Sequence, residues 1–327
     1  MKTDIFKIQT EEEFRQACLE TFRFQYENVE VYRKFVDYLN IHPLEIKDIG
    51  DVPFLPIEMF KNHLVLDKNL TTDFYFQSSG TTQMNRSKHY IPNLKLYEES
   101  IAKSFEQFIG KPEDYIFLGL LPNYSENPHS SLIYMIDYLM NKSGKIENGY
   151  FLYNHQDLFE ILNSIQNKKI LLFGVSFALL DFLDSIETLN LSLSQTSNLT
   201  IIETGGMKGR KEEMTKDQLL GILQQGFKTD KIYSEYSMTE LLSQAYSLGN
   251  NEYESPHWMK ILIRNTEDPF SNVEEGRTGA INIIDLANKH SCSFIATQDL
   301  GKIQNGKFQV LGRIDHSDIR GCSLLVS

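Results

Sequence analysis

Short apolar runs alternate with segments of helical character between about residues 115 and 236, and this alternation limits the possible folds more than any other feature. The predicted strands are 115–121, 149–153, 168–174, 199–204 and 231–236, and the predicted helices are 130–140, 157–165, 176–186 and 214–225. Strands that alternate with helices of this length form a parallel sheet with helices on both faces. The sequence therefore predicts an α/β fold with a doubly wound, mainly parallel sheet.

The segments on either side of this alternation differ from it. Helices are expected at 11–24 and 29–39, strands at 74–77 and 89–92, and a helix capped by Asn93 that runs to about Phe108. Short strands separated by turn residues are expected at 259–265, 279–285, 293–297 and 307–312. We therefore predict an α/β core with a helical N-terminal part, residues 1–254. A small β-rich subdomain, residues 255–327, is expected to follow it and to end in a short tail that carries a cysteine.

Charge and composition narrow the classes of partner. Lys plus Arg number 32 and Asp plus Glu number 44, so the formal net charge is 32 − 44 = −12. Nucleic acids and anionic membrane surfaces require a basic surface, so neither is expected as a partner. The longest apolar run, 170–180, is too short to span a bilayer. The N-terminus also lacks the apolar stretch of a signal peptide, and we expect a cytoplasmic protein.

Two motifs carry groups suited to binding phosphate and a planar ring. Ser78-Ser79-Gly80-Thr81-Thr82 follows a predicted strand, and its hydroxyls and backbone N–H groups can point at phosphate oxygens. No Gly-Lys-Ser/Thr follows, so this is not a Walker loop. Gly205 and Gly206 follow the buried run 199–204, at the carboxyl end of a strand, where doubly wound sheets bind ligands. Alone, each motif is more typical of a turn.

Three further motifs carry polar groups in the second half of the chain. Tyr236 offers an aromatic face, Thr239 a hydroxyl, and Glu240 a carboxylate that could hold Mg²⁺ beside phosphates. Asp299, in TQDLG, and Arg313, in GRID, offer an acceptor and donors to vicinal hydroxyls such as those of ribose. Taken singly, these motifs are more typical of a helix start or a turn.

In their order and spacing the five motifs resemble those of the adenylate-forming superfamily, which includes acyl-CoA synthetases, peptide-synthetase adenylation domains and luciferases. Within it, the chain is similar to LuxE-type acyl-protein synthetases of the bacterial fatty-acid reductase complex. That narrower resemblance rests on FLPIEMFK at 54–61, on SSGTT without a Gly-x-Pro-Lys tail, and on RGCS at 320–323. The resemblance covers nearly the whole chain and implies the adenylate-forming large-domain fold. The chain ends beside GRID, so we expect the superfamily's C-terminal lid, with its catalytic lysine, to be absent or vestigial.

The resemblance also implies a role for each motif residue. Ser78 to Thr82 would embrace the β- and γ-phosphates of ATP, and Gly205 and Gly206 would border the adenine. Tyr236 would stack on the adenine, Thr239 would bond the α-phosphate, and Glu240 would bind Mg²⁺. Asp299 and Arg313 would hold the ribose hydroxyls. The candidates to replace the lid lysine are Arg86, Lys88, Lys208 and Arg210, although solvated surface positions are more typical of such residues. His129 lies in a segment similar to the region near the family's acyl pocket, but it is more typical of a helix start.

The three cysteines, Cys18, Cys292 and Cys322, contain no CxxC pair, so neither a disulfide framework nor a zinc site is expected. LuxE-type synthetases hold an acyl group as a thioester on a cysteine near the C-terminus, which matches Cys322. ATP turns an unreactive carboxylate into an acyl-adenylate, and a thiolate can then take the acyl group. The resemblance thus implies activation of a carboxylic acid, with a fatty acid as the expected class. The thioester on Cys322 would be delivered to a partner such as an acyl reductase or an acyl carrier.

Two alternative functions remain open at this point. The protein could pass the activated acyl group to coenzyme A or to a carrier protein, as ligases of the phenylacetate-CoA type do. It could also be a nucleotide-binding subunit without catalysis, because the lid lysine is missing. In every case Cys18 and Cys292 are expected to be structural.

Overall fold

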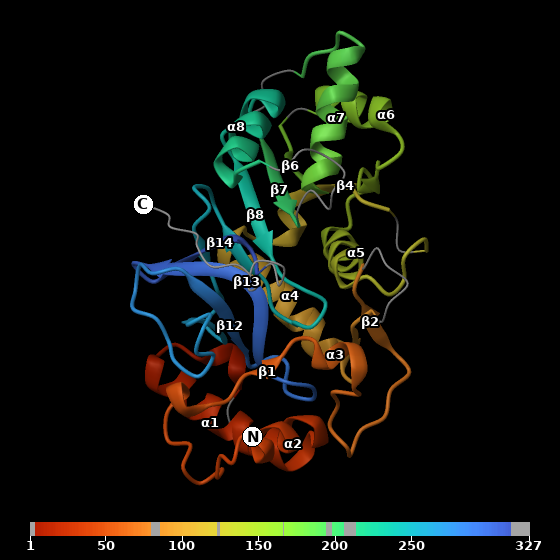
Figure 1. Ribbon diagram of the computed structural model, residues 1–327. Coiled ribbons are helices and arrows are strands. Elements are labelled where there is room, and N and C mark those ends of the chain that lie inside the picture. The colour runs from red at the N-terminus through yellow and green to blue at the C-terminus, as the bar shows by residue number, and fades with distance from the viewer. Residues whose placement is uncertain are drawn as a thin grey trace.

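The structure of the protein, a computed structural model, describes residues 4–79, 86–122, 125–165, 167–193, 198–205 and 214–314. It confirms the predicted α/β fold, with one large mixed sheet of 12 strands and helices on both faces of its parallel half (Figure 1). Among the described residues, no helix combines the length and the apolar character needed to cross a bilayer.

The strands of the large sheet are β1 (Leu55–Pro56), β4 (Tyr115–Leu120), β5 (Gly149–Tyr150), β6 (Lys169–Val175), β7 (Leu199–Thr204), β8 (Ile232–Tyr236), β9 (Ala245–Ser247), β10 (Tyr253–Glu254), β11 (Met259–Arg264), β12 (Gly279–Asp285), β13 (Phe294–Gln304) and β14 (Lys307–Arg313). A separate sheet pairs β2 (Tyr75–Gln77) with β3 (Lys88–Tyr90). The α-helices are α1 (Glu11–Asn28), α2 (Glu30–Tyr38), α3 (Met59–Asn62), α4 (Leu94–Phe108), α5 (Ser131–Ser143), α6 (His155–Ser164), α7 (Ser176–Thr188) and α8 (Lys216–Phe227). The 3₁₀ helices are η1 (Ile5–Lys7), η2 (Ile49–Asp51) and η3 (Pro112–Asp114).

Local sequence signals explain several helix boundaries. Thr10 and Glu13 form a capping box at the start of α1, and Thr215 and Gln218 form another at the start of α8. In such a box, each side chain accepts a hydrogen bond from a backbone N–H group that the helix leaves unpaired. Gly144 is the C-cap of helix α5, and its φ of 62° is accessible to glycine without a steric penalty.

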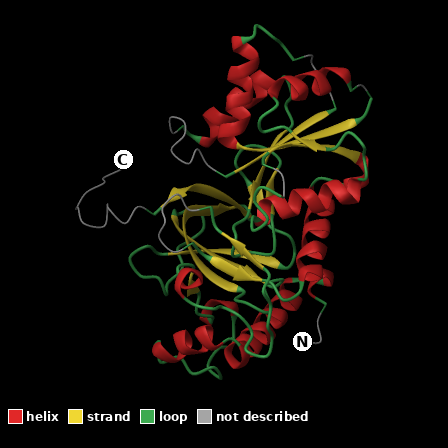
Figure 2. Cartoon of the chain, turned by 90° about the vertical axis from the view of Figure 1, so that its right-hand side faces the viewer, coloured by secondary structure: helices red, strands yellow, loops and turns green. Residues whose placement is uncertain are grey.

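The parallel half of the sheet has the strand order β8-β7-β6-β4-β5. Crossover connections between parallel strands are right-handed, so the face that a helix covers depends on the direction in which the chain moves along the sheet. The chain moves outward from β4 to β5 through α5, and then returns through α6, α7 and α8 to β6, β7 and β8. Helices α4 and α5 therefore pack together on one face, and α6, α7 and α8 pack together on the other (Figure 2).

The antiparallel half continues the same sheet in the order β9-β10-β14-β13-β12-β11. The N-terminal helices α1 and α2 lie beside these strands (Figure 1). Gln25 of α1 is fully buried and donates to the carbonyl of Asn288 at 3.0 Å and to Oγ of Ser293 at 3.1 Å. The rings of Tyr32 and Phe294 stack at 5.8 Å. The N-terminal helical part thus packs on the strands assigned to the second domain, and the division at residue 254 remains a prediction.

Four details differ from the sequence prediction. The strand expected at 149–153 is only two residues long, because only Gly149 and Tyr150 pair with β4 at this edge of the sheet. Asn93 occupies the N-cap position of α4, but its side chain makes no capping hydrogen bond. TQDLG, alone typical of a turn, lies inside β13, where antiparallel neighbours on both sides hold it extended. The short strands β9 and β10 were not predicted.

Candidate active site

The adjacent parallel strands β7 and β8 end at Thr204 and Tyr236, on the same edge of the sheet. Gly205 follows β7 with a φ of 71°, a left-handed conformation that favours glycine. Its carbonyl accepts a 3.0 Å hydrogen bond from Oγ of Ser176, the first residue after β6. Gly205 and Tyr236 therefore lie side by side at the carboxyl edge, and Gly206 lies outside the described residues.

The two ends of the SSGTT loop are joined to each other. The backbone N–H of Ser78 donates to the carbonyl of Ser87 at 3.1 Å, and the N–H of Ser87 donates to Oγ of Ser78 at 3.0 Å. These bonds extend the pairing of β2 with β3 and fix where the loop begins and ends. Ser79 is exposed, and Gly80, Thr81 and Thr82 lie outside the described residues.

Glu240 lies next to this loop. Its side chain is buried, with 5% of the residue exposed, and the Ser87 side chain lies close enough to its carboxylate to lower its pKa. Burial raises the pKa of Glu240, while the neighbouring Ser87 side chain and the positive charges of Arg313 and Lys61 oppose that rise. Ser87 bonds Ser78 and lies beside Glu240, so the first motif lies close to the third although the two are far apart in the sequence.

A second buried carboxylate fixes the chain directly after Glu240. Oδ2 of Asp285 accepts hydrogen bonds from the backbone N–H groups of Leu242 at 2.8 Å and Ser243 at 3.0 Å. Oδ1 of Asp285 accepts from the Ser243 hydroxyl at 2.6 Å, and Nε1 of Trp258 donates to the same hydroxyl at 2.8 Å. Burial raises the pKa of Asp285, and these hydrogen bonds oppose the rise. Sequence analysis missed Asp285, because an Asp at the end of a strand resembles an ordinary turn residue.

The third, fourth and fifth motifs meet at Asp299. Its Oδ2 accepts a 2.8 Å hydrogen bond from the Tyr236 hydroxyl, and its Oδ1 lies 3.3 Å from Nε of Arg313. Asp299 and Arg313 are register partners on β13 and β14. Burial raises the pKa of Tyr236 well above its usual value, and the neighbouring charge of Asp299 adds to the effect. The two residues expected to hold ribose are thus in contact, and the predicted adenine-stacking residue touches one of them.

The segment 54–61, which carries the narrower family resemblance, packs against the TQDLG motif. Strand β1 pairs in parallel with β13, so that Leu55 lies opposite Ile295. Three residues later, Glu58 accepts a hydrogen bond from Nε2 of Gln298, the residue before Asp299. A β-carbon at Gly301 would lie 2.5 Å from the backbone oxygen of Gln309, so glycine permits the close approach of β14 here.

The chain matches the family model of the acyl-protein synthetases of the LuxE type over residues 4–117 and 127–327. It belongs to the LuxE family of acyl-protein synthetases. The protein is therefore a ligase, and its fold agrees with that assignment. A sequence comparison with curated proteins gave no match.

Several solved structures of adenylate-forming ligases share the fold of this LuxE-family protein. A 2-hydroxyisobutyryl-CoA ligase, in an open conformation with 2-HIB-AMP and CoA, superposes with a TM-score of 0.72 at 11% identity. That match covers 93% of this chain and 70% of the ligase. ATP-bound MatB from Rhodopseudomonas palustris superposes with a TM-score of 0.52 at 14% identity, over 73% of this chain and 47% of MatB. At these identities the likeness establishes the fold alone.

In the LuxE-family protein, two buried carboxylates lie on the strands next to the Gly205 turn. Sequence analysis did not identify them. Glu203 accepts from Oγ of Ser176 at 2.9 Å and pairs with Nζ of Lys216. On the next strand, Oε2 of Glu235 accepts from Oγ1 of Thr204 at 2.5 Å. Burial raises the pKa of Glu235 to about 7, against the effect of hydrogen bonds from neighbouring hydroxyls. The only sequence signal was a carboxylate near the end of each of two predicted strands, 199–204 and 231–236.

The candidate cations and His129 occupy different surroundings. Nζ of Lys88 lies 4.7 Å from the centroid of the Tyr75 ring, and the His129 ring stacks on the same tyrosine at 4.4 Å. His129 directly precedes the N-cap of α5, which agrees with a helix-start position. Arg86 is exposed. The candidates outside the described residues are Lys208, Arg210 and Cys322.

Cys18 and Cys292 are both fully buried, and burial raises the pKa of each thiol to about 12. A thiol with so high a pKa carries almost no thiolate at neutral pH and is a poor nucleophile. Their surroundings agree with the structural role expected of them.

The described residues can be tested for a fit to Mg²⁺. Among them, no group of three or more His, Cys, Asp or Glu side chains could form a protein-only metal site. Mg²⁺ bound beside phosphates needs only one or two carboxylates, because water and phosphate oxygens complete its octahedron. Glu240 suits such a role, since its buried carboxylate forms no salt bridge within the described ranges and would be stabilised by a cation.

Proposed function

We propose that this LuxE-family ligase uses ATP and Mg²⁺ to activate a fatty acid as an acyl-adenylate and then transfers the acyl group to its own Cys322. The observation that carries the proposal is that described residues of the motifs lie close together although they are far apart in the sequence. Ser87 bonds Ser78 and lies beside Glu240, and the Tyr236 hydroxyl at the end of β8 bonds Asp299. Such convergence supports a single nucleotide site formed by all the motifs.

Each motif has a distinct role in the proposed site. Ser78, Ser79, Gly80, Thr81 and Thr82 bind the β- and γ-phosphates through hydroxyl and N–H groups. Gly205 and Gly206 border the adenine, Tyr236 lies against it, and Thr239 donates to the α-phosphate. Glu240 would hold Mg²⁺, which supplies positive charge to the phosphates when bound. Asp299 and Arg313 bind the ribose hydroxyls. The contact between these two residues already holds both side chains in position for that binding.

The proposed chemistry has two balanced steps. In the first, a carboxylate oxygen of the acid attacks the α-phosphorus of ATP, and the bond to the bridging oxygen of the departing pyrophosphate breaks. In the second, the Cys322 sulfur attacks the acyl carbon, the bond to the AMP oxygen breaks, and the thiol proton passes to solvent. The products are AMP, pyrophosphate and an S-acyl Cys322. An acyl reductase or an acyl carrier is the proposed recipient, and a cytoplasmic location remains a prediction.

Intact-protein mass spectrometry tests the transfer to Cys322. The full chain is incubated with Mg-ATP and a panel of fatty acids of different length. We expect an adduct equal to the acid minus water, sensitive to hydroxylamine, that is absent without ATP and absent in Cys322→Ser. Cys18→Ala is the matched control and should keep the adduct. No adduct on the wild-type chain, or one that persists in Cys322→Ser, contradicts the assignment.

The same incubation, repeated with added coenzyme A, distinguishes acyl transfer to coenzyme A from acyl transfer to Cys322. A ligase that uses coenzyme A releases pyrophosphate in amounts that depend on added CoA and that are unaffected by Cys322→Ser. Our proposal requires a stoichiometric adduct without CoA. Binding of ATP with no pyrophosphate release for any carboxylate would instead identify a nucleotide-binding subunit without catalysis.

A further inference from the structure

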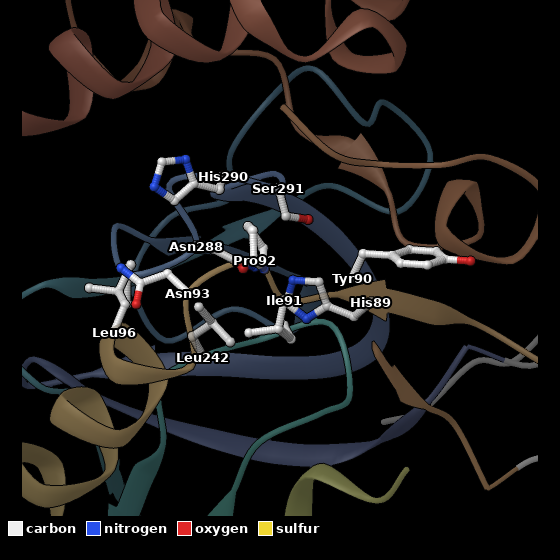
Figure 3. Close-up of a pocket in the computed structure, with 11 residues that line it drawn as sticks. His89, Tyr90, Ile91, Pro92, Asn93, Leu96, Leu242, Asn288, His290 and Ser291 are labelled. Carbon is white, nitrogen blue, oxygen red and sulfur yellow. The ribbon is translucent and has the colours of Figure 1, made fainter. Parts of the chain in front are cut away.

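A small cavity lies between β3 and the turn that joins β12 to β13 (Figure 3). Its volume is about 10 Å³, and its lining includes His89, Leu242, Asn288 and Ser291. The three polar residues among them are at most 2% exposed. Each presents a buried atom that has no hydrogen-bond partner in the described part of the chain: Nε2 of His89, Oδ1 of Asn288 and Oγ of Ser291.

Two of these side chains also bond the backbone of the motif that runs from Tyr236 to Glu240. Nδ1 of His89 lies 2.9 Å from the carbonyl oxygen of Thr239, and Nδ2 of Asn288 donates to the carbonyl oxygen of Glu240 at 2.6 Å. A carbonyl oxygen can only accept, so Nδ1 carries the proton and Nε2 is left as an acceptor. Burial lowers the pKa of His89 to about 4, against the effects of the Thr239 carbonyl and Asn288, so the ring is neutral at pH 7.

The unpaired atoms match the hydrogen-bonding capacity of one water molecule. A cavity of about 10–15 Å³ holds a single water, and buried waters make about three hydrogen bonds to otherwise unpaired polar groups. A water here can donate one hydrogen to Nε2 of His89 and the other to Oδ1 of Asn288, and can accept from the Ser291 hydroxyl. Two acceptors and one donor are therefore satisfied together.

We propose that one water binds in this cavity and that His89 and Asn288, bridged by it, are positioning residues for Thr239 and Glu240. The two residues bond consecutive carbonyls, so together they restrict the peptide unit that presents both motif side chains. The Phe60 ring packs edge-on against His89 at 5.6 Å and limits rotation of the imidazole. The water site is independent of the proposed function, whereas the positioning role rests on it.

NMR of ¹⁵N-histidine-labelled protein tests the water bridge without an activity assay. The His89 signals, identified by their loss in His89→Asn, should show a protonated Nδ1 and an unprotonated Nε2 at pH 7. Ser291→Ala should shift the Nε2 resonance of His89. Ser104→Ala should not, although Oγ of Ser104 is likewise buried and unpaired, because Ser104 lies in α4 outside the cavity lining. A proton on Nε2, or equal responses to both serine variants, overturns the bridge.

Kinetics of carboxylate-dependent pyrophosphate exchange test the positioning role. His89→Asn retains an amide donor near the position of Nδ1, whereas His89→Gln moves the amide toward Nε2 and loses that donor. We expect near-normal kcat for His89→Asn and a kcat lower by about 10–100-fold for His89→Gln, as when a partner that orients a metal ligand is lost. The Mg²⁺ concentration for half-maximal rate should rise in His89→Gln, with little change in KM for ATP.

Two outcomes contradict the positioning role, and they have different consequences. Equal losses of kcat and of melting temperature in both His89 variants indicate a purely structural histidine. Absence of exchange by the wild-type protein with every carboxylate overturns the proposed function and the positioning role with it. The imidazole tautomer and its response to Ser291→Ala still decide the water site in that case.

Discussion

The hydroxyl of Tyr236 donates a 2.8 Å hydrogen bond to Oδ2 of Asp299, which lies 63 positions further along the chain. Tyr236 ends β8 in the parallel half of the sheet, whereas Asp299 belongs to β13 in the antiparallel half. Arg313 contacts the other carboxylate oxygen from β14. The contact joins both halves of the sheet at the proposed ribose subsite, so the geometry of that subsite depends on how the halves pack.

Loss of the Tyr236 hydroxyl should weaken ATP binding. A hydrogen bond to a charged group contributes about 1.5–3 kcal/mol, and the lower value corresponds to a roughly tenfold change in Kd. We expect Tyr236→Phe to raise the Kd for ATP by about tenfold in calorimetry, because Asp299 is no longer held in place. Tyr233→Phe, on the same strand, is the control. Equal affinities in the wild type and Tyr236→Phe would show that this bond does not prepare the ribose subsite.

Replacing Glu240 by Gln should remove activity without unfolding the protein. Burial destabilises the ionised carboxylate, so a neutral side chain of the same shape should leave the melting temperature unchanged or slightly raised. Loss of the proposed Mg²⁺ ligand should lower pyrophosphate exchange by about 100-fold. Glu254→Gln, which alters an exposed carboxylate paired with Lys307, should behave like the wild type. Normal exchange by Glu240→Gln would refute the Mg²⁺ role.

Glu235 should make stability depend on pH in a defined window. Burial raises its pKa from 4.5 to about 7 in the folded protein. Between those values the unfolded chain releases this proton and the folded chain keeps it, so the free energy of unfolding falls as pH rises, by about 3 kcal/mol in total. Glu235→Gln should therefore be more stable, relative to wild type, at pH 8 than at pH 5. Urea unfolding at both pH values measures this, and a pH-independent difference would contradict it.

Asp285 should be essential for the structure that follows Glu240. Its two carboxylate oxygens accept hydrogen bonds from the Ser243 hydroxyl and from three backbone N–H groups. An Asn side chain has one acceptor oxygen, so buried donors lose their partners, each at about 1–3 kcal/mol. Asp285→Asn should lower the free energy of unfolding by about 3 kcal/mol, measured with urea, whereas exposed Asp157→Asn should have little effect. A loss below about 1 kcal/mol, the least for one unpaired donor, would mean that relaxation or water re-pairs these groups.

The sequence predicts the parallel half of the fold well, because its strands carry a strong local signal. Every residue of β6 after Lys169 is buried, so the strand is a continuous apolar run. Strands β9 and β10 were missed, because three and two residues are too few to show a period. The pairing of β1 with β13 joins segments more than 200 positions apart and depends on tertiary packing, which local patterns do not encode.

In the candidate site, too, local motifs could be predicted from the sequence, whereas their long-range partners could not. Motif residues such as Glu240 and Asp299 were identified because the order of the motifs along the chain is itself a signal. Their supporting residues, Asp285, His89 and Asn288, were not identified. Each supports the site only through a partner distant in the sequence, so the local pattern around it resembles an ordinary strand or turn.

Carboxylate-dependent exchange of pyrophosphate into ATP tests the central claim most directly, because it requires the phosphate, ribose and metal groups to act on one nucleotide. The full chain is assayed with Mg²⁺ and a panel of fatty acids, beside Glu240→Gln and Tyr236→Phe. The account predicts exchange by the wild type that depends on the acid, is nearly abolished in Glu240→Gln, and needs more ATP in Tyr236→Phe. No exchange with any acid, or equal exchange by all three proteins, would contradict a shared site for the motifs.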